Sequence, residues 1–339
     1  QESYKEASNL IGFFGRLTYN YKEKYLIMAN LRHEASSRFV GTKQPWGTFP
    51  SVSVGWRISE EQFMKEIRFV DYLKLRAGYG VTGTAPDHLF LGVSRLGYDT
   101  RFLIDGQWVL GLSPVNNPNP YLKWEVKKEF NAGIDFTVFN NKVSGSIDFY
   151  NRRTDGLLYD YAVPSPPNLY SITTANVGVM DNRGIEVLLD FAPVQTTKFS
   201  WKSGITFSAN RNKLVSLDND LYKATNPWFN AGTTPTPILL YSHRVEVGKE
   251  IGNFWGFKVI GVTDDGYWIY EDKDGNPAST VTENDKKKIG NGLPKFYAGW
   301  NNNFQYGNFD LDITMRGAFG FQIINSQRML FEVPGFSSY

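Results

Sequence analysis

The sequence predicts an all-β protein that forms part of a transmembrane antiparallel β-barrel with long extracellular loops. Three observations lead to this prediction. About ten long stretches alternate apolar with polar residues, short turns and long loops alternate between these stretches, and aromatic residues gather at the short-turn ends. Ordinary strands have about five or six residues, whereas a tilted strand that crosses a bilayer needs roughly nine to eleven. The length of the alternating stretches therefore favours a membrane barrel.

The stretch 123–138 shows the alternation most clearly. Successive strand side chains point to opposite faces of a sheet. One face of this strand would carry Trp124, Val126, Phe130, Ala132, Ile134, Phe136 and Val138, and the other Glu125, Lys127, Glu129, Asn131, Asp135 and Thr137. In a membrane barrel the apolar face meets lipid and the polar face lines a lumen. Trp124, Trp201 and Trp300 are accordingly expected to face lipid.

The same pattern predicts strands along the whole chain. Their expected ranges are 10–21, 25–36, 49–58, 72–81, 123–138, 143–155, 182–191, 199–210, 296–306 and 309–319. Tight turns are expected at 22–24, at Asn140-Asn141 and at Gly307-Asn308, since Asn and Gly favour the backbone of hairpin turns. Residues 60–67 suit a short amphipathic helix, 83–121 a loop rich in Gly and Pro, and 212–294 a long, irregular extracellular loop region.

The aromatic residues cluster where the turns are short. They make up 16% of the chain, and those next to short turns are Tyr19, Tyr21, Tyr25, Phe136, Phe139, Phe191, Phe199, Phe304, Tyr306 and Phe309. A membrane interface favours such a belt, because an aromatic ring can place one part in lipid and another in water. A soluble β-sandwich gives no reason for aromatic residues to concentrate at one end of every hairpin.

Composition narrows the class of protein further. The chain has 339 residues and no cysteine, which excludes disulfides and thiol-ligated metals. Its net charge of +2 indicates no nucleic-acid partner. Mean hydropathy is −0.36, and no apolar run reaches the length of a membrane helix. A barrel is still compatible with that value, because its apolar residues occupy every second position. The start at Gln1 suggests a mature or internal fragment.

Several blocks of sequence resemble the SusC/RagA-like branch of the TonB-dependent outer-membrane transporters of Bacteroidetes. They follow one another in the order of the family over nearly the whole chain. The blocks are NLIGFFGRLTYNYKEKYLIMANLRHEASSRF (9–39), WGTFPSVSVGW (46–56), LKLRAGYGVTGT (73–84), LKWEVKKEFNAGIDF (122–136), NVGVMDNRGIEVLLDF (176–191) and KIGNGLPKFYAGW (288–300).

This resemblance implies a location in the bacterial outer membrane and a role in nutrient import. Such transporters have an N-terminal plug domain and a barrel of about 22 strands, so residues 1–339 would be part of the barrel, without the plug and the TonB box. The resemblance also implies a SusD-like surface lipoprotein as partner, energy from TonB through the missing N-terminal region, and an oligosaccharide or oligopeptide as substrate. Residues 333–338, with Pro334, are expected to begin another extracellular loop.

Substrate contacts are expected in the loops, where aromatic rings can stack on sugars and polar groups can bind hydroxyl or peptide groups. Trp228, within the run Asn226-Pro227-Trp228-Phe229-Asn230, is the strongest single candidate. The remaining candidates are Trp108, Trp268, Arg101 and Asn230.

No cofactor is expected, and the only metal-like run is Tyr270-Glu271-Asp272-Lys273-Asp274-Gly275. Calcium in the extracellular loops is a weak possibility there, because a calcium loop needs several oxygen ligands at alternating positions. Tyr270 occupies the first of these positions and Lys273 adds a positive charge, so an acidic β-turn is the preferred interpretation.

An enzyme is not expected. The three histidines, His33, His88 and His243, lie on separate segments, and the strand carboxylates are better explained by ion pairing with Arg16, Arg32, Lys127, Lys202 and Arg316 across the lumen face. Two alternatives remain: a soluble or surface glycan-binding β-sandwich, and a small outer-membrane barrel enzyme. The first would need no detergent, and the second would need a cluster of histidine and carboxylate side chains.

Overall fold

The computed structural model describes residues 5–234, 236 and 238–331, and the chain divides into two compact units. The first unit comprises Gln1–Arg183 with Ser216–Lys223, and the second Gly184–Val215 with Ala224–Tyr339. The segment 333–338, expected to begin an extracellular loop, lies outside the described residues. None of the helices in the described ranges has the length and apolar character that crossing a membrane would require.

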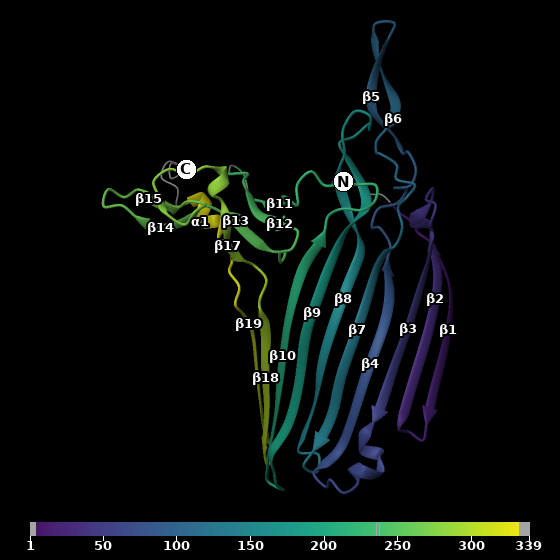
Figure 1. Ribbon diagram of the computed structural model, residues 1–339, viewed down its shortest axis with the longest axis vertical. Coiled ribbons are helices and arrows are strands. Elements are labelled where there is room, and N and C mark those ends of the chain that lie inside the picture. Colours follow the sequence, from purple (N-terminus) through teal and green to yellow (C-terminus); the bar gives the residue numbers. More distant parts are fainter. Residues whose placement is uncertain (1–4, 235, 237, 332–339) are drawn as a thin grey trace. The chain divides into compact units, whose positions relative to one another are not determined.

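The main sheet has ten strands, and their order in the sheet follows their order in the chain. They are β1 (Leu10–Tyr21), β2 (Tyr25–Ser36), β3 (Trp46–Arg57), β4 (Val70–Thr84), β7 (Glu125–Val138), β8 (Val143–Ala162), β9 (Ile172–Gln195), β10 (Phe199–Ser216), β18 (Phe296–Tyr306) and β19 (Phe309–Phe319). Pairing is antiparallel from β1 through β8 in the first unit and from β10 through β19 in the second. The strands of the first unit lie side by side in Figure 1. The predicted all-β, antiparallel architecture is confirmed.

Three strands are longer than the alternation predicts. β8 has 20 residues, β9 has 24 and β10 has 18. Each continues past the point where apolar residues stop alternating with polar ones. Backbone pairing extends beyond the apolar band because a strand needs an apolar face only where it meets lipid, while its ladder of hydrogen bonds can continue into water.

The two faces of the sheet have reversed exposure compared with a soluble protein. On the apolar face, Phe13 is 65% exposed and Leu17 is 69% exposed. On the polar face, the side chain of Asp148 is only 15% exposed because it is covered by an ion pair. A soluble strand would bury the apolar side chains. The main sheet therefore presents its apolar face outward, as a barrel wall does in lipid.

The connection between β3 and β4 departs from the expected alternation of short turns and long loops. It lies at the same end of the strands as the tight turn between β1 and β2, yet it runs from residue 58 to residue 69. The amphipathic helix expected at 60–67 is replaced by two single 3-10 turns, η2 (Ile58–Glu60) and η3 (Gln62–Met64). Phe63, Ile67 and Phe69 remain exposed along this connection.

A small aromatic core lies at the opposite, loop-side ends of the strands. Phe39, in the 3-10 turn η1 (Ser37–Phe39), is 1% exposed and packs with Phe49 and Trp124. The ring of Trp124 lies 4.9 Å from that of Phe39 and 5.4 Å from that of Phe49, and its Nε1 donates to the Pro45 carbonyl. The expectation that Trp124 faces lipid is therefore wrong. This side chain lies beyond the apolar band, where loop residues cover it.

The stretch 83–121 contains a hairpin that the sequence did not predict. Its strands are β5 (Leu96–Ile104) and β6 (Gln107–Pro114), joined through Asp105 and Gly106, both of which have positive φ angles. Figure 1 shows this hairpin extending from the loop-side ends of β4 and β7.

The region 212–294, predicted to be irregular, is folded into two small sheets in the second unit. One has the order β11-β12-β13-β17 and the other β14-β15-β16. Their bounds are β11 (Trp228–Thr233), β12 (Tyr241–Glu246), β13 (Asn253–Gly256), β14 (Lys258–Val262), β15 (Trp268–Glu271), β16 (Pro277–Ala278) and β17 (Lys287–Asn291). The 3-10 turn η4 (Glu283–Asp285) precedes β17, and the helix α1 (Ser326–Phe331) follows β19. The expectation of an irregular region is therefore wrong.

Candidate functional site

The small sheet β11-β12-β13-β17 carries an arginine stacked between two tryptophans. The guanidinium carbon of Arg244 lies 3.7 Å from the ring centroid of Trp228 and 4.0 Å from that of Trp255. All three side chains are half-buried. We call Trp228, Arg244, Trp255 and the adjacent Asn230 the Arg244 stack.

Strand register brings these residues together. On the paired strands β11 and β12, Trp228 lies opposite Glu246 and Asn230 opposite Arg244, so the four side chains share one face. The next pair, β12 and β13, aligns His243 with Phe254, which places Trp255 diagonally beside Arg244. Each of the three strands has six residues or fewer, so contacts between strands rather than long alternation define this face.

A hydrogen bond and the local charges orient the guanidinium. Nε of Arg244 donates to Oδ1 of Asn230 at 3.2 Å. Burial lowers the pKa of Arg244, while the carboxylates of Glu246 and Glu283 act in the opposite direction. An arginine stays protonated under all ordinary conditions despite such a shift. The stack therefore holds a permanent positive charge in a partly desolvated position.

The arrangement determines which contact Arg244 can still make. Both faces of its guanidinium are covered by indole rings, and Nε is used by Asn230. Within the described part of the chain, its two terminal nitrogens donate no hydrogen bond. Such an edge matches the geometry of a carboxylate or phosphate, which accepts two parallel N–H bonds. The stack is thus chemically suited to an anionic group rather than to a neutral sugar ring.

The predicted substrate-contact residues occupy three different places. Trp228 and Asn230 belong to the Arg244 stack. Arg101 and Trp108 share one face of the β5–β6 hairpin, where Arg101 pairs with Leu110 and Leu103 with Trp108, and the Trp108 side chain is 68% exposed. Trp268 begins β15 in the other small sheet and is 57% exposed.

Two members of the stack were not among the predicted contact residues. Arg244 and Trp255 become neighbours of Trp228 only through strand pairing. A weak signal is present in the sequence, because Trp228 and Asn230 on one side, and Arg244 and Glu246 on the other, are each spaced by two residues.

The acidic run at 270–275 forms a turn held by protein donors. Oδ1 of Asp272 accepts the backbone N–H groups of Asp274 at 2.9 Å and Asn276 at 2.8 Å. Glu271 accepts from Lys258 at 2.5 Å and from Lys287 at 2.8 Å, and these two bonds lower its pKa. Across the described ranges, no group of three or more potential ligands (His, Cys, Asp or Glu) is arranged to hold a metal ion.

The polar face of the main sheet carries an ion-pair ladder in the first unit. Arg76 on β4 donates through Nε to Asp135 on β7 at 3.1 Å and through Nη2 to Asp148 on β8 at 2.6 Å. Arg152 on β8 donates to Glu129 on β7 at 2.6 Å. Charged side chains thus pair across neighbouring strands, as the sequence predicts, although Arg76 was not foreseen as the centre of the ladder.

The family is shown by sequence comparison. A family model described as TonB dependent receptor-like, beta-barrel, matches residues 2–315. The TonB-dependent receptor P39 of Formosa agariphila is 31% identical over 360 residues, an alignment that covers 92% of this chain and 33% of the relative. The TonB-dependent receptor SusC of Bacteroides thetaiotaomicron is 30% identical over 328 residues, covering 94% of this chain and 32% of the relative.

A solved structure has the same fold. The structure of the RagAB peptide transporter superposes with a TM-score of 0.83 at 24% identity, over 96% of this chain and 35% of the solved chain. The chain thus spans about a third of the length of the proteins that it matches. It belongs to the TonB-dependent receptor-like β-barrel family and is an outer-membrane protein of the SusC/RagA type.

Proposed function

We propose that the receptor containing this chain imports oligosaccharides or oligopeptides across the outer membrane, with energy supplied through TonB. The observation that carries this proposal is the reversed sheet, with an exposed apolar face and a polar face bearing the ladder of Arg76, Asp135 and Asp148. Such a sheet suits the wall of a water-filled lumen in lipid. The names of SusC and of the RagAB peptide transporter support the class of substrate.

The proposal includes a SusD-like lipoprotein that covers the loops on the outer surface. It also gives the Arg244 stack the role of contacting an anionic group on the substrate, such as a peptide carboxylate or an acidic sugar. Stacking between two indoles restricts the guanidinium, so less conformational entropy is lost when a carboxylate binds. The geometry of the terminal nitrogens supports this role.

The proposed role is transport without catalysis. His33 stacks on Trp46 with ring centroids 4.7 Å apart, and His243 contacts Ser242 and the ring of Phe254. These contacts support packing roles for both histidines.

Uptake in cells that carry the whole receptor tests the transport proposal. Labelled peptides and oligosaccharides should enter, and a protonophore that collapses the inner-membrane gradient should stop entry. A SusD-like lipoprotein should also co-purify with the receptor in detergent. Uptake that resists the protonophore would contradict energy coupling through TonB.

Substitutions at Arg244 test the proposed contact. Arg244→Ala should lower uptake of substrates that carry a carboxylate more than uptake of neutral ones, and Arg244→Lys should restore only part of it, because lysine keeps the charge but not the planar fork. Lys249→Ala, an exposed cation just after β12, is the matched control. Equal losses for charged and neutral substrates would remove the anion-contact role.

A further inference from the structure

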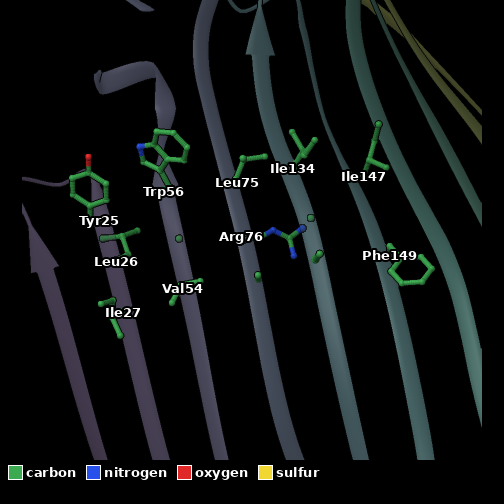
Figure 2. A pocket seen from close by; sticks show the side chains of 14 residues that line it. Tyr25, Leu26, Ile27, Val54, Trp56, Leu75, Arg76, Ile134, Ile147 and Phe149 are labelled. Atoms are coloured by element: carbon green, nitrogen blue, oxygen red, sulfur yellow. The ribbon is translucent and has the colours of Figure 1, made fainter. Parts of the chain in front are cut away.

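The outward face of the first unit contains an apolar groove that the transport function does not use. Its volume is about 720 Å³, within the range of sites that hold small molecules. The groove crosses β2, β3, β4, β7 and β8, which at the usual strand spacing is a length of about 19 Å. Figure 2 shows the side chains that line it.

The lining follows the register of the sheet in two neighbouring rows. Pairing across the five strands aligns the first row, which consists of Ile27, Val54, Ala77, Ala132 and Phe149. It also aligns the second row, nearer to the short turns, which consists of Tyr25, Trp56, Leu75, Ile134 and Ile147. All ten positions point to the outward face, so the groove is open toward lipid.

The groove exists because two small residues meet at its centre. Ala77 and Ala132 are directly paired across β4 and β7, and their methyl groups leave a depression between larger neighbours. The next pair toward the loops, Tyr79 and Phe130, projects outward with exposed fractions of 44% and 46%. These two rings form one wall, and Leu75 with its partner Ile134 forms the other.

The turn-side end of the groove changes from apolar to charged. The hydroxyl of Tyr25 donates to Oε1 of Glu61 at 2.7 Å, and the indole N–H of Trp56 donates to the same oxygen at 3.1 Å. Nζ of Lys24 lies 3.1 Å from Oε2 of Glu61. The two aromatic residues therefore turn their polar atoms toward the β3–β4 connection and leave their ring carbons in the groove.

The β3–β4 connection continues this change of chemistry. Downstream of Glu61 it exposes two cations, Lys65 and Arg68, among the exposed apolar side chains of Phe63, Ile67 and Phe69. Interleaved cations and apolar groups at the end of a lipid-facing strand suit the level of lipid phosphates. An apolar groove that ends at a cationic, aromatic border matches one amphiphile: an acyl chain attached to a phosphate head group.

We propose that this groove binds one phospholipid from the leaflet level with the short turns. One acyl chain lies over Ala77 and Ala132, between the wall of Tyr79 and Phe130 and the wall of Leu75 and Ile134. The phosphate lies near Lys65 and Arg68. Because the groove is concave, the chain contacts protein on more than one side, so this lipid exchanges more slowly than lipids on the rest of the outward face.

Filling the groove tests the proposal. The whole receptor is reconstituted in phospholipid nanodiscs, released into detergent, and examined by native mass spectrometry for retained phospholipid. Ala77→Phe and Ala132→Phe keep the face apolar but occupy the depression, and each should abolish retention of one phospholipid per receptor. Ala298→Phe, on the paired strand β18 outside the groove, is the matched control and should retain it. Equal retention in all variants would overturn the proposal, as would a change in receptor oligomer mass with no change in bound lipid.

A second measurement does not depend on those variants folding. Phospholipid with brominated acyl chains quenches nearby tryptophans, and after exchange into bromine-free detergent the retained lipid should still quench the wild-type receptor. Trp56→Phe should remove this residual quenching. Lys65→Ala combined with Arg68→Ala should weaken retention of phospholipid but not of an uncharged glycolipid with the same chains. Residual quenching that is unchanged in Trp56→Phe would place the lipid elsewhere and refute the assignment.

Discussion

At the scale of single residues, Glu61 shows how one carboxylate can anchor the turn-side end of three strands. It accepts hydrogen bonds from Tyr25 on β2, from Trp56 on β3 and from Lys24 in the first turn. These bonds, that of Tyr25 above all, lower the pKa of Glu61 from its ordinary value of 4.5. The native state therefore binds fewer protons near that pH than the unfolded state does.

The sign of the pH dependence follows from this shift. The stabilisation from ionised Glu61 is complete above pH 4.5 and is lost as the pH falls through the lower native pKa. Glu61→Gln should reduce the free energy of unfolding of the receptor at pH 7, and the difference from wild type should shrink below pH 4.5. Denaturant titrations in detergent at both pH values measure this.

Glu60→Gln provides the control for that experiment. Glu60 is the preceding residue and pairs with Arg57 at 3.4 Å, and its side chain is 46% exposed. Exposed pairs contribute little to stability, so this variant should behave like wild type at both pH values. A difference between Glu61→Gln and wild type that does not change with pH would contradict the assigned ionisation.

At the scale of elements, the ladder around Arg76 ties three strands together. The side chain of Arg76 is 31% exposed, and those of its partners Asp135 and Asp148 are 28% and 15% exposed. Removing the cation would leave two carboxylates facing each other across β7 and β8, and each would have to recover its hydration.

Arg76→Met should therefore destabilise the receptor by about 1.5 to 3 kcal/mol, the usual contribution of a hydrogen bond to a charged group. Arg152→Met removes a more exposed pair, with exposed fractions of 45% and 34%, and should cost no more than about 1 kcal/mol. Heat-dependent migration in gels and denaturant titration both report the difference. Equal effects of the two variants would contradict the partial burial of the Arg76 ladder.

Elements also show how far the sequence alone can be taken. The ten long strands were predictable because each keeps an apolar face over many residues, and the ladder of charges follows from the same alternation. The small sheets of 212–294 were not, since strands such as β13, with four residues, are too short for a periodic signal. Trp228 and Asn230 were predicted as contact residues from their chemistry. Arg244 and Trp255 were not, because their neighbours depend on a register that the sequence does not display.

At the scale of the whole molecule, the outward face of the main sheet behaves as the surface of a membrane protein. Val52 and Ser53 are consecutive residues near the middle of β3, and they point to opposite faces. Val52 is 45% exposed and pairs with Tyr79 on the apolar face, whereas Ser53 pairs with Gly78 on the polar face.

Val52→Arg should strongly reduce the amount of receptor assembled in the outer membrane, since an arginine near the middle of the bilayer costs about 2 to 4 kcal/mol. Ser53→Arg adds the same side chain one position later, on the polar face, and should assemble normally. Quantitative blotting of outer-membrane fractions distinguishes the two. Similar assembly of both variants would show that the apolar face does not meet lipid.

The reversed faces of the sheet also bear on how such a sequence can diverge. Core residues in a soluble protein must match the shapes of their neighbours, so a change in one constrains the others. Outward residues such as Phe13 and Leu17 meet a fluid that adapts to any apolar shape, so drift among Leu, Val, Ile and Phe leaves the backbone undisturbed. This tolerance explains how a TM-score of 0.83 is compatible with only 24% identity. Substitutions along each strand should accordingly accumulate with a period of two residues, conservative in hydrophobicity on one face and free in size there.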